Sequence, residues 1–445
     1  MVKVNNLYIQ DTIVASASAA GIGGINIIRL SGVHTEKIIK IILGKIPLSR
    51  VATHTKFYDQ EKNVLDVGIA IYYPNPDSFT GESVLELHAH GGRFIGKNII
   101  NSIIDMGARR AEPGEFSKRA YLNGKIDLIQ AEAIADLISS GTERSAIAAL
   151  QSLSGVFSDA VSSLEKKLIK LRLYVEAAID FPDEEIDFLS DKSLSDLVDN
   201  CEKSLNDLFH KTTYGQILND GLKIAIIGLP NAGKSSLINL ISGQETAIVT
   251  DIAGTTRDIL KAQVDIDGLS LEFYDTAGLR DDPDSIEAEG IRRTNNIIEE
   301  SDVILWVHDL SLQPTIEQNL EVNVPLIKVF NKIDLIQNLK KNIQGIYISA
   351  NTGEGLEDLY DAIKQSVKYE SAGDGAFSAR MRHKDAIKNA INHFSLGKKA
   401  LIHEHAGEIF AEEIKLCQAA LHEMTGVIDS DDLLGRIFSE FCIGK

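Results

Sequence analysis

Cysteine and long apolar runs are scarce in this 445-residue sequence, and each absence excludes a class of protein. The three cysteines, Cys201, Cys417 and Cys442, are far apart and form no CxxC pair, so we expect neither a disulfide framework nor a zinc site. No apolar run reaches the roughly 20 residues that a membrane-crossing helix needs, so we expect no membrane partner. The start of the chain lacks a basic segment followed by an apolar one, which favours a cytoplasmic protein over an exported one.

Basic residues are also fewer than acidic ones. The chain has 45 Lys and Arg against 64 Asp and Glu, which gives a formal net charge of −19. This balance excludes a protein that coats nucleic acid through its overall field, because such a field repels phosphate groups. A role on RNA would therefore need a local site or a partner.

Changes in composition and hydrophobic periodicity along the chain predict its domains. Residues 1–120 mix β-rich runs with short helical periodicity, which predicts an antiparallel α+β domain. Residues 121–215 are helical, residues 216–372 alternate strands and helices, and residues 373–445 return to helix after a short Gly/Ala/Ser hinge. We therefore predict a multidomain α/β protein in which an α/β domain is inserted into a helical bundle domain.

The strongest motif is the segment GLPNAGKS at residues 228–235, which follows an apolar strand and opens a helix. Its glycines let backbone N–H groups close around phosphate oxygens, and the helix N-terminus adds partial positive charge. Lys234 would reach the β- and γ-phosphates, and Ser235 would ligate Mg²⁺. The residues expected to contact nucleotide here are Asn231, Ala232, Gly233, Lys234, Ser235 and Ser236.

Three further motifs follow in order, each at the end of a β-rich run. They are Asp275-Thr276-Ala277-Gly278, Asn331-Lys332-Ile333-Asp334 and Ser349-Ala350. Asp275 would hold Mg²⁺ through water, and Gly278 would sense whether the γ-phosphate is present. The Asp334 carboxylate would accept hydrogen bonds from the guanine N1–H and amine, a donor pair that adenine lacks. A backbone N–H at Ser349-Ala350 would meet the guanine O6. Together the four motifs predict a protein that binds and hydrolyses GTP.

The Thr-rich segment Gly254–Asp258 fits a switch loop. Thr256 is the expected second hydroxyl ligand to Mg²⁺, with Thr255 as the alternative, and a solvated loop is the other interpretation. Directly after the Asp-Thr-Ala-Gly motif comes Leu279, where Ras-like proteins carry the glutamine that orients the attacking water. We expect another residue, within 280–289, to position that water.

Segments near both ends of the chain resemble one bacterial family. They are 79–92 (FTGESVLELHAHGG), 109–128 (RRAEPGEFSKRAYLNGKIDL), 130–134 (QAEAI) and 441–445 (FCIGK). These segments resemble the tRNA-modification GTPases of the MnmE (TrmE) family, and the likeness extends from Thr12 to Lys445. The Pro-Gly-Glu-Phe block and the Cys-Ile-Gly-Lys end are specific to that family.

This resemblance implies a homodimer joined through N-terminal domains that bind a tetrahydrofolate derivative, 5-formyl or 5,10-methylene, as one-carbon donor. It also implies an FAD-dependent MnmG-type partner. With that partner the protein would add a (carboxymethyl)aminomethyl group to C5 of the wobble uridine of certain tRNAs. The positions that match folate contacts are Arg29, Glu86, Lys125 and Lys445. Considered on the residues alone, Arg29 and Lys125 could pair with folate carboxylates or form surface salt bridges.

The resemblance further implies that G domains associate across the dimer around a K⁺ ion, which replaces an arginine finger. The matching K⁺ ligands are Asn231, Thr250, Ile252 and Thr255, and the catalytic candidates are Lys234, Glu287 and Cys442. Glu287 matches a glutamate that orients water, although it also fits a solvated helix start. An oxygen of Asn231 could hold a cation between phosphates, or the side chain could cap the P-loop turn. Cys442 matches a terminal cysteine, for which a structural role is the alternative to a nucleophilic one.

A regulatory or ribosome-assembly GTPase without folate chemistry is the alternative function. The terminal Cys-Ile-Gly-Lys and the segments around Glu86 and Lys125 favour the modification enzyme, because an assembly factor would not need them. No KH-like domain and no second P-loop follow the G domain. One position departs from the family pattern: Gly21 is followed by Ile22, where an arginine is usual.

Overall fold

The structure is a computed structural model that describes most of the chain, in two compact units. The described residues are 11–19, 21–180, 192–243, 261–275, 298, 301–312, 324–336, 343–367, 376–426, 431–439, 441 and 444. The first unit joins residues 1–135 to 418–445, and the second spans residues 136–417.

The first unit contains a six-stranded sheet with the order β3-β4-β5-β2-β1-β6. Its strands are β1 (Thr12–Ser16), β2 (Ile25–Gly32), β3 (Thr53–Tyr58), β4 (Val64–Tyr73), β5 (Val84–His90) and β6 (Arg109–Arg110). Neighbouring strands are antiparallel except for β1 and β6, which are parallel. With its helices this sheet confirms the α+β class predicted for the N-terminal region.

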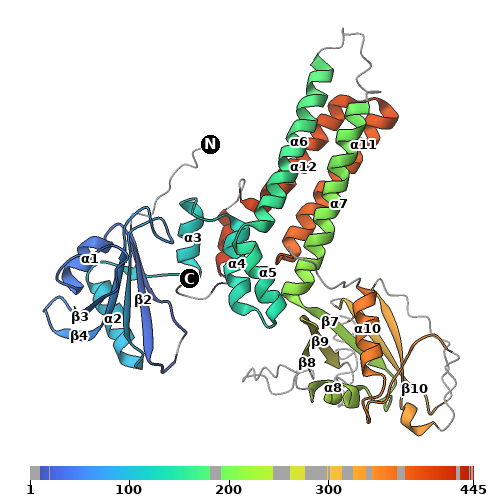
Figure 1. Ribbon diagram of the computed structural model, residues 1–445, viewed down its shortest axis with the longest axis horizontal. Helices are drawn as coiled ribbons and strands as arrows, with labels where there is room; N and C mark the ends of the chain where they lie inside the picture. Colours follow the sequence, from blue (N-terminus) through green and yellow to red (C-terminus); the bar gives the residue numbers. More distant parts are fainter. Residues whose placement is uncertain are drawn as a thin grey trace, which may run out of the picture. The chain divides into compact units, whose positions relative to one another are not determined.

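The two faces of this sheet differ because successive side chains of a strand point to opposite sides. Leu30 and Leu85 belong to the face that packs on α1 (Thr35–Ile42) and α2 (Arg93–Asp105), where the apolar core of this unit lies (Figure 1). Their neighbours in sequence, Arg29 and Glu86, therefore project from the other face.

The C-terminal segment of the chain packs into the same first unit. Helix α3 (Glu115–Leu122) is followed by α4 (Leu128–Ser139), and α13 (Asp431–Ser439) is the last helix. Leu128 and Ala131 share a buried cluster with Phe438 and Phe441. The Tyr121 hydroxyl also donates to the Gly426 carbonyl at 2.5 Å. Residues some 300 positions apart in sequence thus form one core.

Long helices make up the parts of the second unit on either side of the α/β segment. They are α5 (Glu143–Leu153), α6 (Val156–Asp180), α7 (Lys192–Asp220), α11 (Met381–Glu404) and the start of α12 (Gly407–Thr425). Helices α6, α7 and α11 lie side by side (Figure 1). Since α11 follows the α/β segment in the chain, that segment is inserted between helices that pack together.

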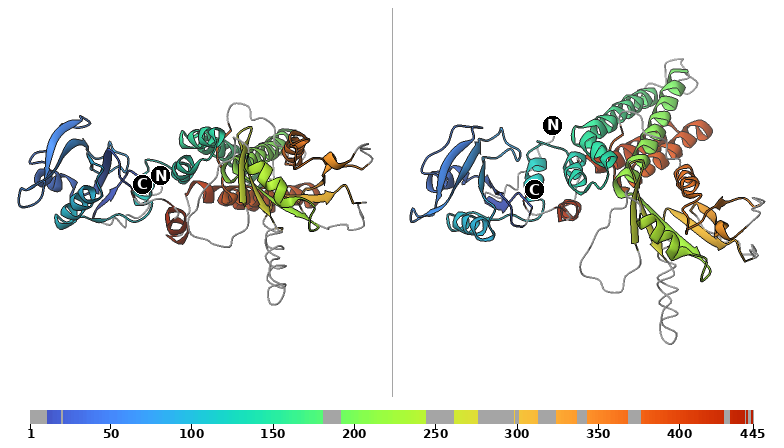
Figure 2. Two further views of the ribbon diagram at one scale, coloured as in Figure 1. Left: turned by 90° about the horizontal axis from the view of Figure 1, so that it is seen from below. Right: turned by 60° about the horizontal axis from the view of Figure 1, so that its bottom comes forward.

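The inserted segment forms a second six-stranded sheet with the order β12-β11-β10-β7-β9-β8, shown from two directions in Figure 2. Its elements are β7 (Leu222–Gly228), α8 (Lys234–Ser242), β8 (Lys261–Ile266), β9 (Leu269–Asp275), β10 (Val303–Asp309), β11 (Leu326–Asn331), the 3₁₀ turn Ile333–Leu335, β12 (Ile346–Tyr347) and α10 (Leu356–Ser366). All pairings are parallel except β8 with β9. Buried residues of α8 and α10 pack into the core cluster on one face of this sheet. Among the described residues, no helix is long and apolar enough to cross a membrane.

Candidate functional site

The predicted nucleotide motifs meet at one edge of the second sheet. Strands β7, β9, β10 and β11 run parallel, so their carboxyl ends lie at the same edge. The chain continues from β7 to β9 on one side and then to β10 on the other, which makes β7 the point where the strand order reverses. Ligands of open α/β sheets bind outside the strand ends at such a point.

The P-loop connects β7 to α8 in the conformation that its residues predict. Lys234 is buried, and its ammonium donates to the carbonyls of Gly228 at 3.0 Å and Leu229 at 2.9 Å. Gly233 has φ +90°, and a Cβ at this position would lie 2.2 Å from the Asn331 amide nitrogen. Glycine is therefore required at residue 233 both by its backbone conformation and by the close approach of a second motif.

Asn331 joins three of the predicted motifs. Its Nδ2 donates to the Ala232 carbonyl in the P-loop at 2.9 Å, and its Oδ1 accepts from the Ala350 N–H at 2.9 Å. The side chain is 1% exposed, so both halves of the amide are satisfied inside the protein. This single residue therefore holds the P-loop and the two segments predicted to recognise the base in fixed register.

The base-recognising residues are also held by neighbours. The Ser349 hydroxyl donates to Asp334 Oδ1 at 2.7 Å, which orients that carboxylate. Lys332 Nζ donates to Asp309 Oδ2 at 2.6 Å. Burial would raise the pKa of Asp309, but the hydrogen bonds from Lys332 and Ser311 outweigh it and lower that pKa.

Asp309 was not among the residues predicted from the motifs. It ends β10, the apolar run Val303–Asp309, in the same way that Asp275 ends β9. A charged residue directly after a buried strand of a parallel sheet was the available signal. Its role is to hold Lys332, whose φ of +69° places it in a left-handed conformation.

Ten predicted site residues lie outside the described part of the chain. They are Thr250, Ile252, Thr255, Thr256, Thr276, Ala277, Gly278, Glu287, Cys442 and Lys445. Of the direct Mg²⁺ and K⁺ ligands predicted, only Asn231 and Ser235 are among the described residues. No cluster of three or more His, Cys, Asp or Glu side chains that could hold a metal occurs within that part either. Hydroxyl, amide and phosphate oxygens suit both of these hard cations without such a cluster.

The sheet face opposite α1 and α2, here called the Arg29 face, brings together two of the predicted folate residues. Arg29 and Glu86 are paired across β2 and β5, and their side chains form an ion pair at 2.9 Å. The Arg29 guanidinium lies 5.8 Å from the ring centre of Phe79 and 5.7 Å from that of Phe116. Burial, followed by the nearby Glu86 charge, raises the pKa of Tyr73 on the adjacent strand. The face therefore offers one cation between aromatic rings, with a carboxylate beside it.

The Lys125 side chain lies beside the loop between β4 and β5. A Cβ on Gly81 would lie 3.4 Å from Lys125 Cγ, so the lysine stem passes along this loop. The C-terminal tail approaches the sheet at β1, where a Cβ on Gly444 would lie 2.0 Å from the Ser16 carbonyl oxygen. Of the predicted folate set, Arg29 and Glu86 are in contact, and Lys125 reaches the loop that carries Phe79.

A buried P-loop lysine, an Asn-Lys-x-Asp segment and a Ser-Ala loop on a parallel sheet define a P-loop GTPase, here joined to a separate α+β unit. Two family models match: the MnmE helical domain over residues 128–442, and the GTP-binding protein TrmE N-terminus over residues 12–125. The chain belongs to the MnmE (TrmE) family of tRNA modification GTPases.

Curated relatives agree over the full length. The chain is 47% identical over 448 residues to the tRNA modification GTPase MnmE of Coxiella burnetii (strain Dugway 5J108-111), covering 98% of this chain and 99% of that protein. It is 46% identical over 446 residues to MnmE of Hydrogenovibrio crunogenus (strain DSM 25203 / XCL-2), with coverage of 98% and 99%. Among solved structures, Aquifex aeolicus Era bound to GDP and AlF₄⁻ is 28% identical over 39% of this chain and 66% of its own, with a TM-score of 0.26.

Proposed function

We propose that this protein hydrolyses GTP in order to drive modification of tRNA, acting with an FAD-dependent MnmG-type partner. The product is a (carboxymethyl)aminomethyl group on C5 of the wobble uridine, and the carbon comes from a 5-formyl or 5,10-methylene tetrahydrofolate. The protein acts in the cytoplasm as a homodimer. Its domains are an N-terminal folate-binding and dimerisation domain (1–120), a two-part helical domain (121–215 and 373–445) and a G domain (216–372).

The observation that carries this proposal is the linkage of motifs through Asn331. Hydrogen bonds to Ala232 and Ala350 bring the phosphate-binding and base-recognising parts of a guanine nucleotide site to one sheet edge. Bound GTP and Mg²⁺ would supply the cleavable phosphoanhydride and neutralise its charge. Lys234 would bind the β- and γ-phosphates, Ser235 would ligate the metal, and Asp334 would recognise guanine.

The proposed folate site lies on the Arg29 face, which also carries Glu86. Arg29 lies between two aromatic rings, a setting that suits a flat, anionic molecule such as a reduced folate, and Lys125 adds a second cation nearby. The existing pair with Glu86 holds Arg29 in place and leaves the carboxylate able to accept from pterin N–H groups. Lys445 at the chain end would complete the set, and Cys442 is the candidate nucleophile.

For GTP hydrolysis we propose that K⁺ takes the place of an arginine finger. Leu279 stands where a water-orienting glutamine would be, so Glu287 is assigned that role. The K⁺ ion would be held by Asn231, Thr250, Ile252 and Thr255. The Mg²⁺ ion would be held by Ser235 and Thr256.

The experiment that tests the folate assignment is a calorimetric titration of the full chain with 5-formyltetrahydrofolate, with Arg29→Ala as the comparison. We expect saturable binding that the variant loses, because it removes the cation between Phe79 and Phe116. If neither protein binds at high ligand concentration, the alternative of a regulatory or ribosome-assembly GTPase without folate chemistry gains support.

A further inference from the structure

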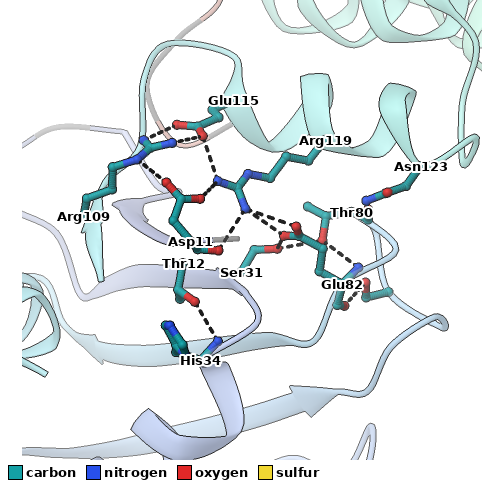
Figure 3. Close-up of polar contacts among 11 residues, drawn as sticks. Asp11, Thr12, Ser31, His34, Thr80, Glu82, Arg109, Glu115, Arg119 and Asn123 are labelled. Atoms are coloured by element: carbon teal, nitrogen blue, oxygen red, sulfur yellow. Dashed lines mark hydrogen bonds and ion pairs between the residues drawn. The ribbon is translucent and has the colours of Figure 1, made fainter. Parts of the chain in front are cut away.

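Five charged side chains form one ion-pair network in the first unit: Asp11, Glu82, Arg109, Glu115 and Arg119 (Figure 3). Arg119 is its centre, because it contacts all three carboxylates while being only 8% exposed. The distances are 2.6 Å to Asp11, 3.1 Å to Glu82 and 2.9 Å to Glu115. Arg119 and Glu115 are the most buried members of the network, and their directional ion pairs fix the relative positions of the segments that carry these charges.

One member of the network, Glu82, lies in a loop. Glu82 belongs to the loop 78–83 that joins β4 to β5, and it also accepts from the Ser31 hydroxyl at 2.7 Å. Thr80 of this loop is fully buried, and the Asn123 amide donates to its carbonyl at 2.6 Å. Asn123 is the residue that ends α3, the helix that also carries Arg119. Helix α3 therefore holds the loop at two points, one by charge and one by an amide hydrogen bond (Figure 3).

The same loop contacts Arg29 through Phe79 and approaches the side chain of Lys125 through Gly81. Phe79 packs over the Arg29 guanidinium at its start. Gly81, at φ +75°, passes so close to Asn123 and Lys125 that a Cβ there would lie 3.0 Å from Asn123 Cβ. Fixing this loop thus fixes the position of the Phe79 ring relative to Arg29, and the path of the Lys125 side chain.

We propose that Arg119 and Asn123 are positioning residues for a reduced folate, which act by holding loop 78–83 in its binding conformation. The inference rests on the folate site proposed above. Neither residue touches the ligand in this account. A loop that is already ordered spares the ligand the entropic cost of ordering it, so losing either anchor weakens binding.

The experiment compares three variants of the full chain. Asn123→Ala removes the bond to the Thr80 carbonyl. Arg119→Lys keeps a positive charge but cannot donate to three carboxylates in fixed directions. Arg109→Lys is the matched control, because Arg109 pairs with Asp11 and Glu115 but has no contact with loop 78–83 among the described residues.

Two measurements are made on each variant. Hydrogen exchange followed by mass spectrometry reports the mobility of residues 78–83, and calorimetry with 5-formyltetrahydrofolate reports affinity. We expect faster loop exchange and about tenfold weaker folate binding for Asn123→Ala and Arg119→Lys, with both quantities within about twofold of the parent for Arg109→Lys. In the reconstituted modification reaction, the first two variants raise the KM for folate and leave kcat unchanged.

Unchanged loop exchange and folate affinity in Asn123→Ala would overturn the proposal, as would equal losses in all three variants, which would mark a general loss of stability. A parent protein that binds no folate while its loop still loosens in Asn123→Ala would overturn the folate site and support the anchoring of the loop by α3. The two failures are therefore distinguishable.

Discussion

At the scale of single residues, the candidate nucleotide site depends on a buried amide, Asn331, whose two polar atoms are both hydrogen-bonded. Asn331 donates to one motif and accepts from another, so neither aspartate nor leucine could replace it without leaving a buried group unpaired. The Ser349 hydroxyl donates to one oxygen of Asp334 at 2.7 Å and thereby orients its carboxylate. The proposed recognition of guanine assigns the base specificity to this one carboxylate.

We predict that Asp334→Asn weakens GTP binding by about 100-fold and improves binding of xanthosine triphosphate, because an amide can donate to the xanthine 2-oxo group but cannot accept two bonds from guanine. The new amide oxygen can still accept from Ser349, so the fold should survive. Fluorescent-nucleotide titrations of both nucleotides measure the ratio. A ratio equal to that of the parent would show that another residue recognises guanine.

The carboxyl group of Glu115 makes the first unit sensitive to acid. Burial on its own would raise the pKa of Glu115, but hydrogen bonds from Arg109, the Glu112 N–H and Arg119 outweigh it and lower that pKa to about 2. A group whose folded pKa is below its unfolded value stabilises the fold above the unfolded pKa, near 4.5 here, and this stabilisation is lost as the pH falls toward 2.

We therefore expect the free energy of unfolding to fall between about pH 4.5 and pH 2 by an amount on the order of 2 kcal/mol from this group. Glu115→Gln should be less stable than the parent at pH 7 and should lose less of its stability over that range. Urea unfolding at several pH values gives the comparison, with the exposed Glu112→Gln as control. Parallel pH profiles for the parent and Glu115→Gln would contradict this account.

At the scale of elements, much of the architecture could be predicted and some could not. The strand at Val64–Tyr73 and the P-loop context were predictable because alternation and glycine spacing are local signals. Strand β3 was not predicted: its sequence THTKFY has only one buried residue, Phe57, and is defined by pairing with β4. Helix α7 extends to Asp220, past the predicted boundary of the helical segment at residue 215, because its last turns are buried against the inserted sheet.

In the candidate site too, some residues could be predicted from the sequence and others could not. The residues predicted to contact nucleotide lie in short motifs with fixed spacing, which are local signals in the sequence. Asp309 and Arg119 act through partners 23 and 37 positions away, and nothing local in the sequence connects those pairs. Such residues are found only when the fold brings the segments together.

Helix packing in the second unit depends on a glycine that allows α11 and α12 to approach closely. A Cβ on Gly397 would lie 2.7 Å from the Phe410 ring and 2.8 Å from Glu413 Cβ. We predict that Gly397→Ala destabilises the protein by about 1–3 kcal/mol, despite the higher helix propensity of alanine.

The control is Gly435→Ala in α13, where nothing lies within 4 Å of an added Cβ. Alanine there should be neutral or stabilise by about 0.5–1 kcal/mol. Thermal unfolding followed by circular dichroism distinguishes the two. If both variants unfold at the same temperature, the close packing at Gly397 contributes nothing.

At the scale of the whole molecule, the chain carries a GTPase domain in one unit, and the proposed folate site lies in the other. The charge of −19 fits a protein that meets tRNA at a restricted site and with a partner, not through its overall field. Coupling between the GTPase domain and the proposed folate site would let GTP hydrolysis control the modification.

We predict that K⁺ raises the rate of GTP hydrolysis at least about tenfold over Na⁺ at equal ionic strength, because the chain lacks the Ras-like glutamine at Leu279 and needs another source of transition-state stabilisation. Asn231→Ala should reduce the difference between the two salts. Phosphate release in matched KCl and NaCl buffers makes the comparison. Equal rates for the parent protein would remove K⁺ from the account.

The central claim is tested most directly by reconstituting the modification. Unmodified tRNA is incubated with this protein, an FAD-dependent MnmG-type partner, a reduced folate, glycine or ammonium, and GTP, and its nucleosides are then analysed by mass spectrometry. The account predicts an aminomethyl or carboxymethylaminomethyl group on the wobble uridine that requires GTP and is absent when GDP replaces it or when Lys234→Ala replaces the parent. A wobble uridine left unmodified by the complete mixture, while the same protein hydrolyses GTP, would contradict it.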